Sequence, residues 1–126
     1  MLYEDKTKMI IGAFYDVYNS LGFGFLEKVY ENALAFELED MGFNVQQQQN
    51  IKVYYRGIDV GTYFADIVVD DSIIIELKTA ENICDSHKAQ LKNYLQATKM
   101  EVGLLLNFGP KPEFSRTIFS NNKKNL

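Results

Sequence analysis

The stretch of sequence that decides the fold is Ala65-Asp66-Ile67-Val68-Val69-Asp70-Asp71-Ser72-Ile73-Ile74-Ile75-Glu76-Leu77-Lys78. The β-branched runs on either side of the acidic segment 70–72 are typical of two buried β-strands joined by a tight turn. Asp66, Glu76 and Lys78 lie inside these runs, although burying a charge costs several kcal/mol unless it is paired or binds a metal. The stretch therefore predicts a buried hairpin whose charged side chains serve a purpose.

Glu76 and Lys78 are two residues apart, so in a strand both side chains project from one face, while the apolar residues at 73, 75 and 77 project from the other. Asp66 joins this pair only if it lies opposite Glu76, which requires an odd number of loop residues, such as 70–72, or a bulge. A two-residue turn would pair Asp66 with Ile75 and turn the carboxylate to the wrong side. The register of the hairpin is therefore a testable prediction.

The chain has 126 residues, of which 47% are hydrophobic. This length is sufficient for one compact domain with its own core and too short for two comfortable ones. We expect a single domain over residues 1–126, with a core at about 5–108 and a C-terminal edge strand and polar tail at 109–126.

No apolar run approaches the roughly 20 residues of a membrane helix, and the N-terminus lacks the basic-then-apolar layout of a signal peptide. The single cysteine, Cys84, agrees with a reducing compartment. We therefore expect a soluble, cytoplasmic protein without a membrane partner. The net charge of −4 argues against wrapping duplex DNA by bulk electrostatics, so any contact with nucleic acid should be local or helped by bound cations.

Hydrophobic periodicity predicts two helices, three antiparallel strands, a third helix and a further strand. The helices are expected at residues 5–21 and 25–41. The first strand is expected at 44–55, the second follows a turn at 56–59 and runs through residue 63 to 69, and the third is expected at 73–78. The continuous apolar run at 102–108 indicates a strand covered on both faces, parallel to 73–78 through a right-handed crossover. Residues 114–119 are expected as an edge strand and 121–126 as a frayed polar tail. The third helix should start at Asp85 or Ser86 and bury Ala89, Leu91, Tyr94, Leu95 and Thr98.

Two carboxylates and a lysine converging at a strand edge suit metal-assisted hydrolysis of a phosphodiester. The oxygen ligands of Asp66 and Glu76 would hold Mg²⁺ or Mn²⁺, which activates a bound water, and Lys78 would orient or deprotonate that water or stabilise phosphate charge. A glutamate and a lysine on one strand face are more often a solvated surface with a weak ion pair. Both interpretations remain open from this hairpin alone.

Two helical segments add candidate groups. Glu27 lies on the first turn of the second helix with Tyr30 one turn further on the same side, so a third carboxylate could face the strand edge, or simply favour the helix dipole. Gln90 and Tyr94 share one face of the third helix, either at the site or as a core tyrosine with a glutamine at the rim. His87 precedes them and suits a proton shuttle, a phosphate contact or a capping role.

The order of these motifs, Gly24-x-x-Glu27-x-x-Tyr30, then Asp66, Glu76-x-Lys78 and Gln90-x-x-x-Tyr94, resembles the small bacterial GxxExxY protein family, a branch of the PD-(D/E)XK nuclease superfamily. The resemblance spans roughly residues 5–108. It implies an α/β protein with a restriction-endonuclease-like α/β/α core, in which a mixed central sheet is flanked by helices.

The resemblance also implies roles for individual residues. Glu27, Asp66 and Glu76 match the acidic ligands of a Mg²⁺ site, and Lys78 matches the catalytic lysine. Gln90 and Tyr94 match a helix expected to support the site or contact DNA. The sequence departs from the superfamily at position 65, where Ala65 replaces the namesake proline, and at position 64, where Phe64 replaces a basic residue common in relatives.

The sequence thus predicts a Mg²⁺-dependent nuclease that hydrolyses DNA phosphodiester bonds. One alternative is a catalytically silent nuclease-fold module that binds nucleic acid or a protein partner. Another is an interaction protein that forms homo-oligomers through surface aromatics such as Tyr54, Tyr55 and Phe114.

Overall fold

The computed structural model describes residues 3–124. Within this range no helix is long and apolar enough to cross a membrane. The elements follow the predicted order and are α1 (Glu4–Leu21), α2 (Glu27–Asp40), β1 (Val45–Tyr55), β2 (Ile58–Val69), β3 (Ile73–Lys78), α3 (Asp85–Gln96), β4 (Val102–Phe108), β5 (Pro112–Ile118) and a 3₁₀ helix at Asn121–Lys123.

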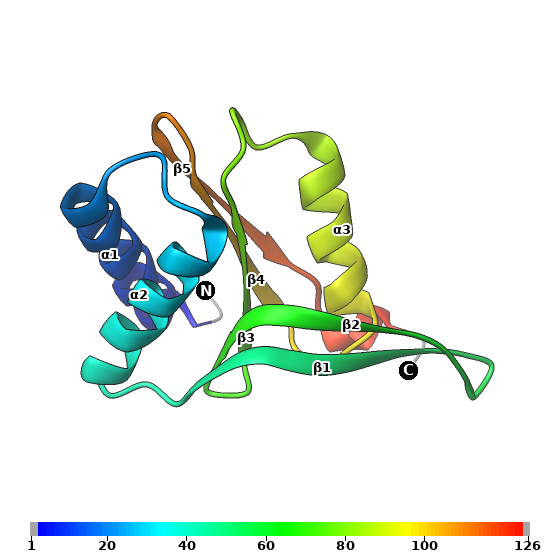
Figure 1. The fold of residues 1–126 in the computed structure, drawn as a ribbon. Coiled ribbons are helices and arrows are strands. Elements are labelled where there is room, and N and C mark those ends of the chain that lie inside the picture. The colour runs from blue at the N-terminus through cyan, green and yellow to red at the C-terminus, as the bar shows by residue number, and fades with distance from the viewer. Residues whose placement is uncertain (1–2, 125–126) are drawn as a thin grey trace.

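The five strands form one mixed sheet in the order β1-β2-β3-β4-β5. Strands β3 and β4 are parallel, as the crossover through α3 predicts, and the other neighbours are antiparallel. Helices α1 and α2 lie on one side of the sheet and α3 lies on the other (Figure 1). The prediction of an α/β protein with a mixed sheet flanked by helices is confirmed.

Two apolar cores fill the spaces between the sheet and the helices. The larger core lies under α1 and α2 and includes Phe14, Tyr30 and Phe108, and the smaller core lies under α3 and includes Leu91 and Leu95. Strand β4 is buried along its whole length, as its continuous apolar run predicts. Helix α3 packs so closely on β4 that a Cβ at Gly103 would lie 2.8 Å from the Leu91 side chain.

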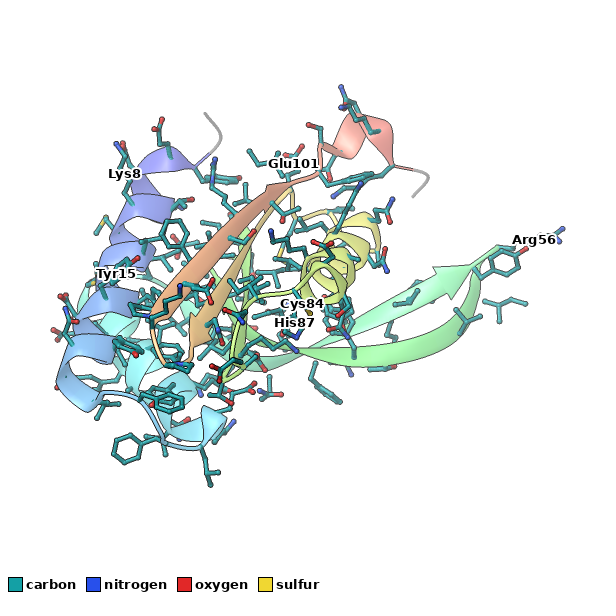
Figure 2. All side chains as sticks on the ribbon, turned by 90° about the horizontal axis from the view of Figure 1, so that it is seen from above. Lys8, Tyr15, Arg56, Cys84, His87 and Glu101 are labelled. Carbon is teal, nitrogen blue, oxygen red and sulfur yellow. The ribbon has the colours of Figure 1, made fainter. Side chains whose placement is uncertain are left out.

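The β2–β3 hairpin has the predicted register. Asp70 and Asp71 adopt positive φ angles of 53° and 50°, and the Ser72 N–H donates to the Val69 carbonyl, so residues 70–72 form the turn. The ladder runs from Val69 opposite Ile73 to Ile67 opposite Ile75, and its continuation places Asp66 opposite Glu76. Beyond this point β2 leaves β3 and continues with β1 as a hairpin that projects from the molecule, with Arg56 at its tip (Figures 1 and 2).

The face of α3 differs from the prediction in two positions. Ala89 is exposed, because it lies two residues from Leu91 and residues at this spacing point to different sides of a helix. The helix ends at Gln96, so Thr98 follows it rather than forming its last turn. Only Leu91 and Leu95 are fully buried.

The prediction of a frayed polar tail is wrong for the residues up to Lys124, and residues 125–126 lie outside the described part of the chain. The Asn121 N–H donates to Glu101 Oε2 at 2.8 Å. The Lys124 ammonium donates to the carbonyls of Thr98 and Met100 at 3.0 and 2.7 Å. These bonds satisfy carbonyls that follow α3 and hold the tail against the body of the protein.

Candidate functional site

The place where β2 and β3 separate positions Asp66. Ala65 packs in the core under α3, whereas Ile67 packs in the core under α1 and α2, so the alternation of side chains along β2 breaks at Asp66. Past Ile75, the β3 backbone has lost β2 as its neighbour, and the Leu77 N–H donates to Asp66 Oδ2 at 2.8 Å instead. The Asp66 carboxylate thus accepts the backbone N–H that has no β2 carbonyl opposite it. We call this point, where β2 and β3 separate, the fork.

Glu76 and Asp66 face one another at this fork. The pKa of Glu76 is raised to about 9, first by burial and then by the charge of Asp66 and a side-chain hydrogen bond with it. Glu76 Oε1 is buried and has no hydrogen-bond partner among residues 3–124. A buried carboxyl oxygen without a partner costs free energy, so a ligand or ion that supplied one would stabilise this position.

Lys78 and Glu27 complete the surroundings of the pair. Lys78 lies on the same face of β3 as Glu76, since the alternate residues Ile75 and Leu77 belong to the opposite core. The pKa of Glu27, the first residue of α2, is raised by partial burial and by the charge of Asp66. The Lys78 charge opposes the pKa rise of both glutamates, so Lys78 lies within electrostatic reach of each of them.

Glu27, Asp66 and Glu76 do not lie close enough together to form a complete metal-binding site. Within the described range, no group of three or more His, Cys, Asp or Glu side chains is close enough to hold a metal ion. Asp66 and Glu76 share a hydrogen bond, while the partly buried Glu27 is within electrostatic reach of Asp66 from the start of its helix.

Gly24 and Tyr30 shape the loop that leads into Glu27. Gly24 has a φ of 116°, which favours glycine. The buried Tyr30 hydroxyl donates to the Gly22 carbonyl and accepts the Phe25 N–H at 3.2 Å, and its ring stacks on Phe108 at 4.4 Å. Tyr30 therefore points into the core rather than to the side of Glu27, and it acts on the backbone that positions that residue.

Gln90 and Tyr94 face the carboxyl pair from α3. The Gln90 side chain hydrogen-bonds with the Tyr94 hydroxyl, and the pKa of Tyr94 is raised by burial and then by the charges of Glu76 and Asp66. The Tyr94 ring stacks on Tyr63 at 3.3 Å. The pKa of Tyr63 is also raised, by burial first and then by Glu76, and its buried hydroxyl has no partner in the described chain. Sequence reasoning missed Tyr63, because a half-buried strand tyrosine has no distinctive signal.

His87 has the capping role among the three that the sequence left open. The Cys84 N–H donates to His87 Nδ1 at 3.3 Å at the start of α3, where both residues lie (Figure 2). Cys84 is exposed, and hydrogen bonds from Ser86 and then from the His87 backbone lower the pKa of its thiol.

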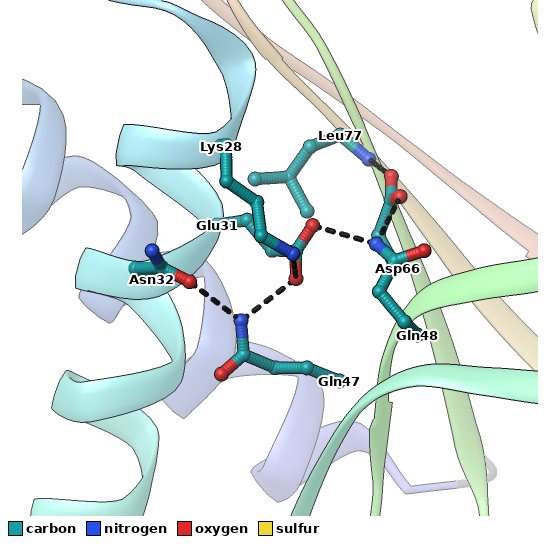
Figure 3. A network of polar contacts seen from close by, with 7 residues as sticks. All are labelled: Lys28, Glu31, Asn32, Gln47, Gln48, Asp66 and Leu77. Carbon is teal, nitrogen blue, oxygen red and sulfur yellow. Dashed lines mark hydrogen bonds and ion pairs between the residues drawn. The ribbon is translucent and has the colours of Figure 1, made fainter.

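A polar network that the sequence did not reveal reaches Asp66 from α2 and β1 (Figure 3). The carboxylate of Glu31, only 3% exposed, accepts bonds from Lys28 at 3.0 Å and from the amides of Gln47 and Gln48 at 2.7 Å each. The Gln48 amide also donates to Asp66 Oδ1 at 3.3 Å. The sequence offered one indication that Glu31 belongs to the site, namely that it lies one helical turn after Glu27.

Another unforeseen residue, Asn107, fixes the end of β3. The buried Asn107 lies opposite Lys78 in the parallel ladder, accepts the Ala80 N–H at 2.9 Å and donates to the Ala80 carbonyl at 3.0 Å. A Cβ at Gly109 would lie 2.3 Å from that carbonyl, so this approach requires glycine. The clamp positions the segment that directly follows Lys78.

The fold and the site together define an α/β protein with an acidic pair and a lysine at the fork of a mixed sheet. The sequence profile of the PD-(D/E)XK nuclease superfamily matches residues 4–117, and the chain belongs to this superfamily. Its fold is the restriction-endonuclease-like fold, so the resemblance is confirmed at the level of the superfamily. Members of the superfamily are generally nucleases, and they typically use divalent metals.

A comparison with solved structures and one with curated proteins complete this picture. The crystal structure of SSO0001 aligns with a TM-score of 0.51 at 22% sequence identity, covering 94% of this chain and 61% of that one. This likeness supports the fold, and the chain spans about three fifths of the length of that protein. No curated protein matches the chain.

Proposed function

We propose that this chain is a metal-dependent nuclease of the GxxExxY type that hydrolyses DNA phosphodiester bonds. The observation that carries the proposal is the contact between Asp66 and Glu76, with Glu76 Oε1 buried and unpartnered within residues 3–124. Membership of the superfamily supports the reaction class.

The donor set fits a hard divalent cation. Two adjacent carboxyls that repel each other as anions offer oxygen ligands of the kind preferred by Mg²⁺ or Mn²⁺, and Mg²⁺ keeps several of its waters. Asp66 and Glu76 would hold the cation, and Glu27 would complete the site directly or through a water. A bound cation supplies charge for the transition state and lowers the pKa of a bound water.

The chain's own groups do the remaining work. Lys78 orients or deprotonates the attacking water and offers positive charge to the phosphate. Gln90 and Tyr94 support the site from α3 or contact the DNA, His87 caps that helix, and Tyr30 holds the loop before Glu27.

Cleavage assays with Mg²⁺ or Mn²⁺ on single- and double-stranded DNA test the proposal. Asp66→Asn and Lys78→Met should lower kcat by at least about 100-fold, the lower range for loss of an acid–base or electrostatic group. Asp71→Asn is the matched control, because it makes the same chemical change at an exposed turn position where asparagine accepts the positive φ. Equal cleavage by all of these proteins would point to a contaminant and contradict the assignment.

Calorimetry without DNA distinguishes a nuclease from a silent module. The wild type should bind Mg²⁺ or Mn²⁺, and Asp66→Asn should not. A protein that binds DNA but no cation would instead be the silent nuclease-fold module.

A second candidate function is homo-oligomerisation, which the projecting β1–β2 hairpin favours. Its Tyr54, Tyr55 and Ile58 side chains are 61%, 65% and 66% exposed, which is unusual for contiguous apolar groups. Light scattering over a range of concentrations tests this, and a constant monomer mass would exclude it.

A further inference from the structure

We propose that Gln48 is a positioning residue for Asp66, and that its side-chain amide, anchored by the buried Glu31, fixes the Asp66 carboxylate in one orientation. The inference rests on the proposed function in one respect: it takes Asp66 to be a cation ligand. It adds to that function two residues, Gln48 and Glu31, that lie outside the acidic motif.

The backbone of β1 is distorted where it passes Asp66. The ladder pairs Gln47 with Ile67 and Gln49 with Ala65, so Gln48 stands opposite Asp66. Gln48 has a φ of 53°, in the left-handed region that a non-glycine residue rarely adopts. Such a conformation persists only where the surroundings hold it, and it often marks a functional position.

The distortion has a visible consequence. Adjacent residues in a regular strand point to opposite faces, yet the amides of both Gln47 and Gln48 lie 2.7 Å from the Glu31 carboxylate (Figure 3). Glu31 Oε2 binds Gln47 and Lys28, and Oε1 binds Gln48. Glu31 is therefore a fixed anchor, held from two elements and neutralised by one lysine.

The amide of Gln48 can serve both acids at once. A side-chain amide has two hydrogens, so one can go to Glu31 Oε1 and the other to Asp66 Oδ1 at 3.3 Å. Asp66 Oδ2 already accepts the Leu77 N–H at 2.8 Å. The Gln48 amide and the Leu77 N–H thus each hold one oxygen of Asp66, and these two bonds set the plane of the carboxylate. Partners of this kind orient metal ligands in other proteins.

The test compares Gln48→Met with Gln47→Met. Methionine has a similar length without amide donors. Gln47 makes the same 2.7 Å bond to Glu31 but, in contrast to Gln48, no hydrogen bond to Asp66 within residues 3–124, so it is the matched control. Gln48→Met should weaken Mg²⁺ binding, measured by calorimetry, by about 10-fold or more. Gln47→Met should stay within about threefold of wild type. In cleavage assays Gln48→Met should lower kcat and leave KM unchanged.

Crystal structures of both variants grown without metal give a readout that does not depend on the proposed function. The Asp66 carboxylate should rotate in Gln48→Met and keep its orientation in Gln47→Met. Gln48→Gly is the second variant if Gln48→Met does not fold, because glycine accepts the left-handed backbone.

Three results would decide against parts of this scheme. Equal Mg²⁺ affinities of the two methionine variants would overturn the positioning role. An unmoved Asp66 in the metal-free Gln48 variant would overturn it as well. If the wild type binds no cation, the proposed function fails, and the metal-free crystals still decide whether Gln48 orients Asp66.

Discussion

Asp66 is the residue through which the separate parts of the site communicate. Its two oxygens accept bonds from β1 and β3, and its charge adds to burial in raising the pKa of the carboxyls of Glu27 and Glu76. A substitution at Asp66 therefore changes backbone geometry and electrostatics together, which is why the asparagine variant is a better probe than alanine.

The pKa of Glu76 has a consequence for stability. The folded protein holds a proton on Glu76 up to about pH 9, whereas the unfolded chain releases it near the ordinary value of 4.5. Because the unfolded state then binds fewer protons, the free energy of unfolding should fall as pH rises between these values, by up to about 1.4 kcal/mol per pH unit from this group. Urea denaturation in EDTA at several pH values within this window measures the slope.

Glu76→Gln removes this titration and should flatten the pH dependence, whereas Glu81→Gln, at an exposed position, should leave it as in wild type. Parallel curves for the wild type and Glu76→Gln would contradict the raised pKa. Saturating Mg²⁺ should also flatten the wild-type curve, because a bound cation favours the ionised carboxyl.

Among the elements, β3 depends on the loop that follows it. Gly109→Ala should destabilise the protein by about 1–3 kcal/mol, because its Cβ would meet the Ala80 carbonyl, which cannot move without breaking the Asn107 clamp. It should also lower cleavage by displacing Lys78. Chemical denaturation measures the first effect. Gly61→Ala is the control, since the described residues leave open space there, and an equal loss in both would argue against the clamp.

The elements were largely predictable because their periodicities are strong and consistent. The alternation of Glu76 and Lys78 with buried apolar residues placed both on one face, and the odd-numbered loop gave the register of Asp66. The separation of β2 from β3 was not predictable, because it reflects how β1 and β2 leave the sheet together.

The missed residues share a physical cause. In the sequence, Glu31 resembles an ordinary surface glutamate, and only the fold shows that two amides of β1 bind it. Asn107 likewise interrupts an apolar run for no evident reason, and only the fold shows its hydrogen bonds with Ala80. A left-handed glutamine such as Gln48 leaves no trace in sequence, since nothing in its neighbours requires it. A charged residue within an apolar run can be recognised from the sequence. Its hydrogen-bond partners cannot, because they come from segments that are distant in the chain.

For the whole molecule, the net charge of −4 limits how nucleic acid can be held. We expect DNA affinity, measured with Ca²⁺ to prevent cleavage, to depend weakly on salt. A plot of log K against log salt should have a slope shallower than about −4, which corresponds to about four phosphate contacts. A slope as steep as about −8 would show a basic interface and contradict this expectation.

The lone thiol at the start of α3 has a practical consequence. Because Cys84 is exposed and its pKa is lowered, a maleimide fluorophore would attach quickly and at a single position of the chain. This position begins the helix that carries Gln90 and Tyr94. Addition of DNA to the labelled wild-type protein should therefore change its fluorescence if the proposed function holds, without a cysteine being engineered or removed.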